Sequence, residues 1–168
     1  MAAAALAAPM ASPSTDPIGA LVRGLAVAFT EGFEASVPLL RIALEAFRRA
    51  DEDAGDVNRW LWLAGRIASE LWDARVWDEL TSRGVRLARE AGALSVLPIA
   101  ASYRAGVHLH AGELTAAAGL MEESAAITQM TGTAPLIYTS PLLAASRGDV
   151  SRAVPLLDAA SRDATARG

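Results

Sequence analysis

Apolar residues recur with a helical period in eight segments of this chain, and short polar stretches with glycine, proline or aspartate separate them. These segments predict helices over roughly 17–31, 33–51, 56–72, 75–91, 96–111, 113–131, 135–147 and 149–166. Val, Ile and Thr form no alternating run, so no strand is expected. Because the connections are short, consecutive helices should pair into four antiparallel hairpins.

Residues at the segment boundaries indicate how the helices begin and end. Asp16 provides an N-cap and Pro17 a first helical residue, where its missing N–H costs no hydrogen bond. Three later N-caps are predicted at Asp56, Ser95 and Asp149. Left-handed residues that close a helix are expected at Gly32, Gly92, Gly112, Gly132 and Gly148. Pro141 lies deeper in its segment and predicts a kink or a late start.

An internal repeat indicates the fold class. The peptide Ser36-Val37-Pro38-Leu39-Leu40 returns as Ala153-Val154-Pro155-Leu156-Leu157, and the offset, 153 minus 36, is 117 residues, or three times 39. Periods of this size are typical of stacked helix pairs. The predicted fold is therefore all-α, a right-handed α-solenoid of helical hairpin repeats.

Residue size also repeats at equivalent helix positions. Second helices of the pairs open with Phe33, Trp77, Leu114 and Val150, followed three residues later by Ser36, Leu80, Ala117 and Ala153. First helices share the small residues Gly24, Ala68 and Ala105, while the fourth pair has Pro141 there. Small positions let partner helices approach closely. The pattern is similar to the tetratricopeptide repeat, although spacings of 36 to 44 residues differ from its usual period.

Several stretches together resemble one protein family across about residues 16–168. They are Arg59-Trp60-Leu61-Trp62-Leu63, Glu70-Leu71-Trp72-Asp73, residues 81–89, residues 103–113 and residues 162–168. They resemble the tetratricopeptide-like helical arm of the large ATP-dependent LuxR-type transcriptional regulators of actinobacteria. The resemblance implies an arm that senses a ligand or partner and couples it to neighbouring AAA-type and helix-turn-helix domains. The resemblance assigns neither ATPase activity nor DNA binding to any residue of this chain.

Composition excludes several kinds of chemistry. Cysteine is absent, which removes disulfides, thiolate nucleophiles and Cys-ligated zinc. All 15 basic residues are arginine, so neither a phosphate-binding-loop lysine nor a Schiff-base lysine exists. No nucleophile–base pair or Gly-x-Ser-x-Gly motif is present. We expect no enzyme activity and no cofactor. The net charge of −4, without a basic stripe, disfavours direct nucleic-acid binding.

Two uncharged stretches bear on domain organisation and location. Residues 1–15 are rich in alanine but lack the basic start and apolar centre of a signal peptide, and are expected to form a flexible leader. Residues 124–146 contain Gly132, Pro135 and Pro141, which make a poor membrane helix. The expectation is one repeat domain over residues 16–168, cytoplasmic and without a membrane span.

Helical geometry and the tetratricopeptide analogy indicate a candidate binding groove. Trp62 and Trp72 are ten residues apart and lie within about 80° of one another on a helix. The positions expected to line the groove are Trp62, Ser69, Trp72, Asp73, Ser102, Gly106 and His110. An aromatic wall with scattered polar groups suits a peptide or a small ligand. The alternative is that these tryptophans belong to the core between repeats.

Metal binding is not expected. His108 and His110 are the only histidines, and their spacing puts them about 200° apart on a helix, so they cannot chelate one ion. The acidic loop Asp51-Glu52-Asp53 with Asp56 lacks the ligand spacing of a calcium loop.

Two functional hypotheses follow. The first is a noncatalytic binding or sensor module for a protein segment or a small effector. The second is a free-standing adaptor or self-associating helical scaffold, forming a homodimer through the ends of the array. The reason is that the last predicted hairpin is strongly apolar, with Leu136, Ile137, Leu142, Leu143, Leu156 and Leu157.

Overall fold

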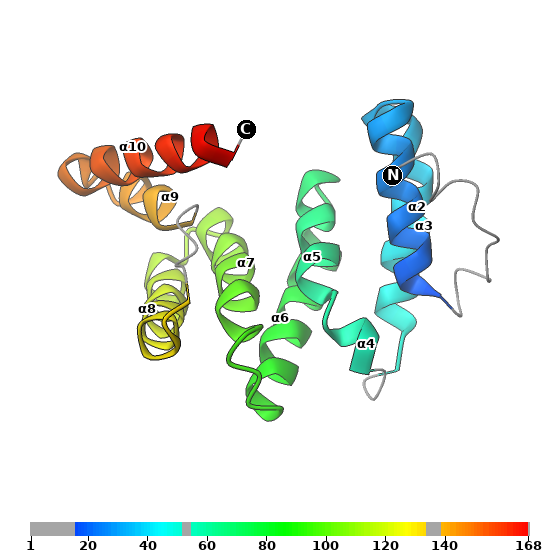
Figure 1. The fold of residues 1–168 in the computed structure, drawn as a ribbon, viewed down its shortest axis with the longest axis horizontal. Helices are drawn as coiled ribbons and strands as arrows, with labels where there is room; N and C mark the ends of the chain where they lie inside the picture. Colours follow the sequence, from blue (N-terminus) through cyan, green and yellow to red (C-terminus); the bar gives the residue numbers. More distant parts are fainter. Residues whose placement is uncertain (1–15, 52–54, 134–138, 168) are drawn as a thin grey trace. The chain divides into compact units, whose positions relative to one another are not determined.

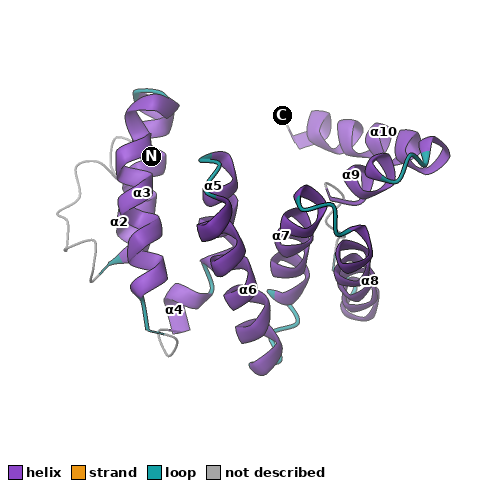
Figure 2. Cartoon of the chain, turned by 180° about the vertical axis from the view of Figure 1, so that it is seen from behind, coloured by secondary structure: helices purple, strands orange, loops and turns teal. Residues whose placement is uncertain are grey.

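A computed structural model describes residues 16–51, 55–133 and 139–167, and these residues form helices and turns with no strand (Figures 1 and 2). The helices are α2 (Pro17–Thr30), α3 (Phe33–Arg49), α4 (Gly55–Asn58), α5 (Leu61–Glu70), α6 (Ala74–Glu90), α7 (Leu97–His110), α8 (Leu114–Thr131), α9 (Thr139–Ser146) and α10 (Val150–Arg167). The all-α prediction is confirmed. No helix among the described residues is both long and apolar enough to cross a membrane.

The chain divides into two compact units, and the boundary falls between Gly84 and Val85 within α6. In the N-terminal unit α2 packs along α3, and α3 packs against α5. In the C-terminal unit α7 packs along α8 and α9 along α10, with α9 also touching α7 and α8. Neighbouring helices in sequence thus form hairpins within each unit.

Small residues allow close helix contact in the N-terminal unit. A methyl group at Gly24 of α2 would lie 2.6 Å from Leu40 Cδ2 of α3. Between α5 and α6, a methyl group at Gly65 would lie 2.7 Å from Thr81 Cγ2. Ala68 and Ala105, the sequence equivalents of Gly24, are fully buried. The small positions recognised from the repeat are therefore buried packing positions, and at Gly24 even a methyl group would meet a neighbouring side chain.

Two apolar clusters lie in the core of the C-terminal unit, among the residues that the structure describes. Val85, Ala88, Leu97, Ala100 and Ile127 form the first, between α6, α7 and α8. Ala105, Leu109, Ala117, Ala118 and Leu143 form the second, between α7, α8 and α9. Five of these ten side chains are alanine, so the helices must approach one another closely to fill the core.

Most predicted helix ends are confirmed. All five predicted glycines have a positive φ, between 59° at Gly92 and 98° at Gly32. The Asp16 carboxylate accepts a hydrogen bond from the Gly19 amide at 2.8 Å, and the Asp149 carboxylate accepts one from the Arg152 amide at 3.1 Å. Pro141 lies in the first turn of α9, which begins at Thr139. Residues 135–138 of the predicted seventh helix, and Glu52 and Asp53 of the acidic loop, lie outside the described residues.

Two predicted N-caps are wrong. Ser95 precedes the cap of α7, which is Val96 and makes no side-chain cap bond. Asp56 lies inside the short helix α4, and the predicted helix 56–72 is divided at Arg59 and Trp60 into α4 and α5. Next to this break the guanidinium of Arg83 donates to Asn58 Oδ1 at 3.1 Å and to the backbone carbonyls of Phe47 and Asp51.

Four helices end in the same two-bond turn, although only three of the turns contain glycine. After α6, α7 and α9 the left-handed residue is Gly92, Gly112 or Gly148, and after α5 it is Trp72, with φ 55°. The Trp72 amide donates to the Ser69 carbonyl at 3.1 Å and the Asp73 amide to the Ala68 carbonyl at 3.0 Å, as in the glycine turns. This is the Schellman motif, which favours glycine because a side chain in this conformation is strained.

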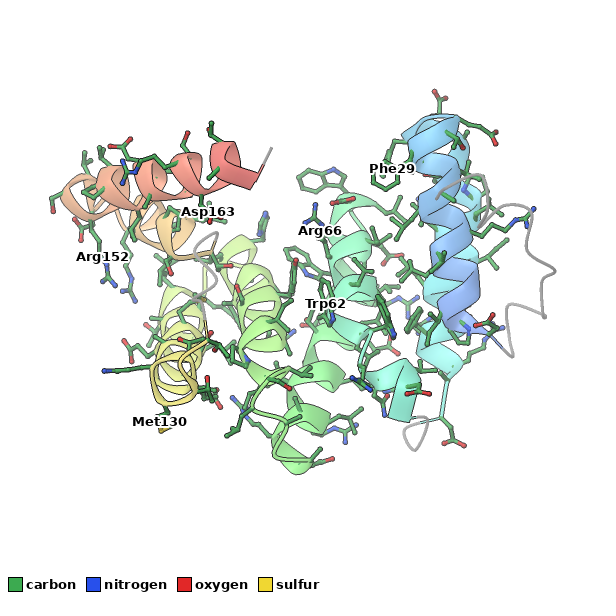
Figure 3. The ribbon with its side chains drawn as sticks, in the orientation of Figure 1. Phe29, Trp62, Arg66, Met130, Arg152 and Asp163 are labelled. Atoms are coloured by element: carbon green, nitrogen blue, oxygen red, sulfur yellow. The ribbon has the colours of Figure 1, made fainter. Side chains whose placement is uncertain are left out.

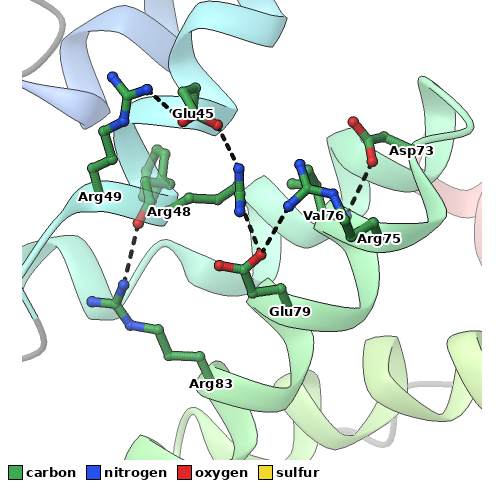
Figure 4. A network of polar contacts seen from close by, with 9 residues as sticks. Glu45, Arg48, Arg49, Asp73, Arg75, Val76, Glu79 and Arg83 are labelled. Atoms are coloured by element: carbon green, nitrogen blue, oxygen red, sulfur yellow. Dashed lines mark hydrogen bonds and ion pairs between the residues drawn. The ribbon is translucent and has the colours of Figure 1, made fainter.

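Ion pairs join α3 to α6 in the N-terminal unit (Figure 4). Arg48 contacts Glu79 at 2.8 Å and Glu45 at 2.7 Å. The hydrogen bond to Glu79 raises the pKa of Arg48 most, and the hydrogen bond to Glu45 raises it further. The hydrogen bond from Arg48 in turn lowers the pKa of Glu45. Exposed pairs of this kind contribute little energy each, so we assign the network a role in orienting the helices.

Candidate functional site

The N-terminal unit contains an apolar cavity of about 460 Å³ between α2, α3 and α5. Its walls combine eight apolar side chains with one arginine and one glutamate. The lining residues are Leu25, Ala28, Phe29, Phe33, Leu40, Trp62, Leu63, Arg66, Ile67 and Glu70. We refer to this feature as the aromatic cavity. Figure 3 labels three of these residues, Phe29 from α2 and Trp62 and Arg66 from α5.

The turn between α2 and α3 positions two of the three aromatic side chains. Glycine at position 32 adopts φ 98°, which lets α3 begin two residues after Glu31 has ended α2. Phe29 and Phe33 consequently stand on opposite sides of the turn and belong to different helices. Phe29 is 83% exposed, which is unusual for a phenylalanine and leaves its ring available to another molecule.

Helix α5 provides the opposite wall. Trp62 and Arg66 are four residues apart, and so are Leu63 and Ile67, so both pairs lie on neighbouring parts of one helix face. Ile67 and Leu40 are buried at the base, whereas Trp62 is half-buried. The cavity thus has a closed apolar floor and a partly open aromatic rim.

The polar groups of the aromatic cavity form one ion pair. Arg66 contacts Glu70 through Nε at 3.0 Å and through Nη2 at 2.9 Å, within one turn of α5. Both side chains are more than a third exposed, so the pair contributes only about 0.3–0.5 kcal/mol to helix stability. A ligand could therefore compete for either partner at small cost.

Of the four groove residues predicted in the N-terminal unit, Trp62 lines the aromatic cavity and the other three do not. Ser69 Oγ donates to the Arg66 carbonyl at 2.6 Å, and the Asp73 carboxylate accepts from the Val76 amide at the start of α6. Trp72 is 85% exposed at the turn after α5. The alternative interpretation, that the tryptophans are core, does not hold for Trp72.

The three groove residues predicted in the C-terminal unit lie on α7. Ser102 is buried and shares a hydrogen bond of 2.7 Å with the Thr139 hydroxyl of α9. The Gly106 carbonyl contacts Nδ1 of His110 at 2.8 Å, and His110 is exposed. Ser102 thus has a packing role, which the sequence did not indicate because Thr139 is 37 residues away.

A smaller cavity of about 160 Å³ lies between α8, α9 and α10, and none of the predicted residues lines it. Its walls include Met121, Arg147, Asp149 and Arg152. The Ser151 hydroxyl and the Arg152 amide bind the Asp149 carboxylate and hold its pKa below its ordinary value. Since the Asp149 carboxylate already caps α10, we do not regard the small cavity as a candidate ligand site.

The two histidines make separate contacts. Nδ1 of His108 lies 2.5 Å from the Glu113 carboxylate, whereas His110 contacts the backbone. Within the part of the chain that the structure describes, no three His, Asp or Glu side chains gather as a metal site.

Of the ten wall residues only Trp62 was predicted from the sequence, and the nine others, among them Leu25, Phe29 and Phe33, were missed. The sequence did contain a sign of this wall, because Leu25 and Phe29 are four residues apart and therefore lie on one face of α2. Trp62 and Arg66 have the same spacing on α5. That signal does not reveal which helices face each other.

Searches with this chain found no matching protein-family model, no matching curated protein and no matching solved structure.

Proposed function

We propose that this chain is a noncatalytic, tetratricopeptide-like binding module whose aromatic cavity accepts an apolar part of a protein segment or a small effector. The observation that carries this proposal is the cavity itself, with walls from three helices and a volume of about 460 Å³. Small-ligand sites typically measure about 300–1,000 Å³ and have apolar walls with a few polar groups. The aromatic cavity has both properties.

The chemistry of the walls indicates the kind of ligand. The walls contain three aromatic side chains, Phe29, Phe33 and Trp62. Aromatic rings have few rotatable bonds, so they can pack against an aliphatic or aromatic group with little loss of side-chain entropy. The ion pair of Arg66 and Glu70 can orient a polar end of the ligand. Burying one leucine-sized group contributes about 1.5–3 kcal/mol, so tight binding needs further contacts outside the cavity.

The proposal extends to the wider role. The internal repeat and the small packing positions support stacked hairpins, and the resemblance to the arm of LuxR-type regulators supports a sensor that couples binding to neighbouring domains in the cytoplasm. In this proposal the ligand stabilises α2 and α3 against α5. Because the stability of a repeat array depends on the interfaces between neighbouring hairpins, a ligand that stabilises one interface also changes the stability of the hairpins beside it.

Fluorescence titration with anilinonaphthalene sulfonate tests the aromatic cavity, because this dye combines an apolar body with one negative charge. Trp62→Ala should weaken dye binding about fivefold or more, since an aromatic contact contributes about 1 kcal/mol. Trp60→Ala is the matched control, because Trp60 caps α5 outside the cavity. Equal dye affinity of both variants, with unchanged helical circular dichroism, would reject the cavity as the binding site.

A further inference from the structure

One end of the aromatic cavity lies where α2 and α5 both end. Among its wall residues, Ala28 and Phe29 belong to the last turn of α2, and Ile67 and Glu70 to the last turn of α5. A helix C-terminus carries about half an elementary negative charge, and a helix N-terminus about half a positive one. Since α3 begins with the wall residue Phe33, two negative helix ends meet one positive end. The backbone therefore makes this end of the cavity attractive to a cation.

The side chains at this end have the same balance of charge. Residues 27–34 and 66–70, which form it, contain three acids and one base. The acids are Glu31, Glu34 and Glu70, and the base is Arg66. An anionic ligand would meet an excess of negative charge here, whereas a cation would be attracted by it.

The carboxylate of Glu70 can accept a further partner. Arg66 contacts it through Nε at 3.0 Å and through Nη2 at 2.9 Å, and both contacts reach the same oxygen, Oε1. A carboxylate has two oxygens with about four acceptor positions, so the ion pair does not saturate Glu70. A cationic ligand can therefore bind Glu70 while Arg66 stays in place. An anionic ligand would instead have to compete with Glu70 for Arg66.

Aromatic rings provide a second attraction for a cation. The face of an aromatic ring attracts a cation that lies within about 6 Å of its centre. Phe29 is 83% exposed and Phe33 is 46% exposed, so both rings are open to a ligand. Trp62 lies eight residues before Glu70, which is about 12 Å along α5. A cation held at Phe29 and Glu70 thus leaves room for an apolar body that reaches Trp62.

We infer that the ligand of the aromatic cavity is a small organic cation, a methylated ammonium group joined to an aromatic or aliphatic body. Its ammonium group contacts Glu70 and the ring of Phe29, and its body lies against Trp62. Methyl groups suit this site because they give the cation an apolar surface that packs against the walls. The inference rests on the proposed function, to which it adds the charge of the ligand.

Two ligands of the same shape and different charge test the inference. They are (4-hydroxyphenyl)trimethylammonium and its neutral counterpart 4-tert-butylphenol, and ligand-observed proton NMR titration gives their affinities for the full chain. We expect the cation to bind at least about fivefold more tightly, as a cation beside a ring and a carboxylate should. Phe29→Leu keeps an apolar wall without the ring, and it should weaken the cation about threefold while leaving the phenol unchanged.

Replacing the carboxylate tests the same contact from the side of the protein. Glu70→Gln should weaken the cation about fivefold and leave the phenol unchanged, because only the cation interacts with the lost charge. Anilinonaphthalene sulfonate, which has the opposite charge, should lose no affinity in this variant. Glu90→Gln is the matched control. Glu90 is also the last residue of its helix and pairs with an arginine four residues earlier, Arg86, but it lies outside the cavity.

The possible failures are distinguishable. Equal affinity of the cation and the phenol, or equal loss of cation affinity in Glu70→Gln and Glu90→Gln, would overturn the inference and leave the cavity as an apolar binding site. If neither ligand nor the dye binds in a saturable manner, the proposed function fails as well. A peptide with trimethyllysine that binds at least about tenfold more tightly than the small cation would overturn the assignment to a small molecule.

Discussion

Trp72 occupies a position at which glycine is favoured, and its replacement tests whether the backbone turn after α5 is strained. Its φ of 55° is close to the φ of Gly92, Gly112 and Gly148 in the three glycine turns, and the same two backbone hydrogen bonds close all four turns. Because the side chain is 85% exposed, removing the indole takes little packing away. The effect of Trp72→Gly should therefore come mainly from the backbone.

The expected magnitude follows from two opposing contributions. A side chain in the left-handed conformation costs about 1–2 kcal/mol, which glycine avoids. Glycine loses about 0.5–1 kcal/mol more conformational entropy on folding. Trp72→Gly should thus stabilise the chain by about 0.5–1 kcal/mol, a rise in melting temperature of about 1–4 °C if the chain unfolds cooperatively. Trp72→Ala keeps the strain and should change the stability by less than about 0.5 kcal/mol.

Urea denaturation followed by far-ultraviolet circular dichroism measures these differences. Gly112→Ala provides the reverse control, because a methyl group there meets no atom within 4 Å and φ is 77°. It should destabilise the chain by about 1 kcal/mol. If Trp72→Gly and Trp72→Ala have equal stability, the turn is not strained. If both are clearly less stable than the wild type, the indole makes a stabilising contact and the reasoning is wrong.

Three further predictions concern packing, polar contacts and pH. Gly24→Ala should destabilise the chain by about 1–3 kcal/mol in thermal unfolding because its methyl group meets α3, whereas Gly119→Ala, in open space on a helix, should stabilise it by up to about 1 kcal/mol. Arg83→Lys should cost about 1–2 kcal/mol in urea unfolding because one ammonium group cannot keep three contacts, and Arg86→Lys on the exposed surface should cost less than about 0.5 kcal/mol. Hydrogen bonds from Ser151 and from the Arg152 amide lower the pKa of Asp149 on folding, so this carboxylate stabilises the chain above its unfolded pKa. The stabilisation disappears as the pH falls through the lower folded pKa. Carboxyl NMR should find the pKa of Asp149 below its ordinary value, and an ordinary value would contradict the N-cap.

Local chemistry explains why many helix ends could be predicted. Positive φ at Gly32 and Gly148, and the caps at Asp16 and Asp149, depend on interactions within a few residues. A pattern in sequence is sufficient for such features because the residues involved are neighbours. The turn at Trp72 was missed for the same reason, since glycine is the usual signal and is absent there.

Contacts between distant residues explain what could not be predicted. Beside the break in the predicted helix 56–72, Arg83 contacts the side chain of Asn58, 25 residues away, and no local pattern indicates this contact. The proposed groove included Trp62, but Ser69 and Asp73 satisfy local backbone groups instead. The aromatic cavity needs α2, α3 and α5 together, and the sequence periodicity of single helices does not specify how they meet.

An apolar ligand is proposed to bind beside Trp62 in the aromatic cavity. Fluorine NMR of the chain with fluorotryptophan at its four tryptophans tests this claim directly, with each resonance assigned by single replacement. During titration with anilinonaphthalene sulfonate, the Trp62 resonance should shift in a saturable manner while those of Trp60 and Trp77 stay in place. A saturable shift at Trp60 or Trp77 with none at Trp62 would contradict the proposed binding site.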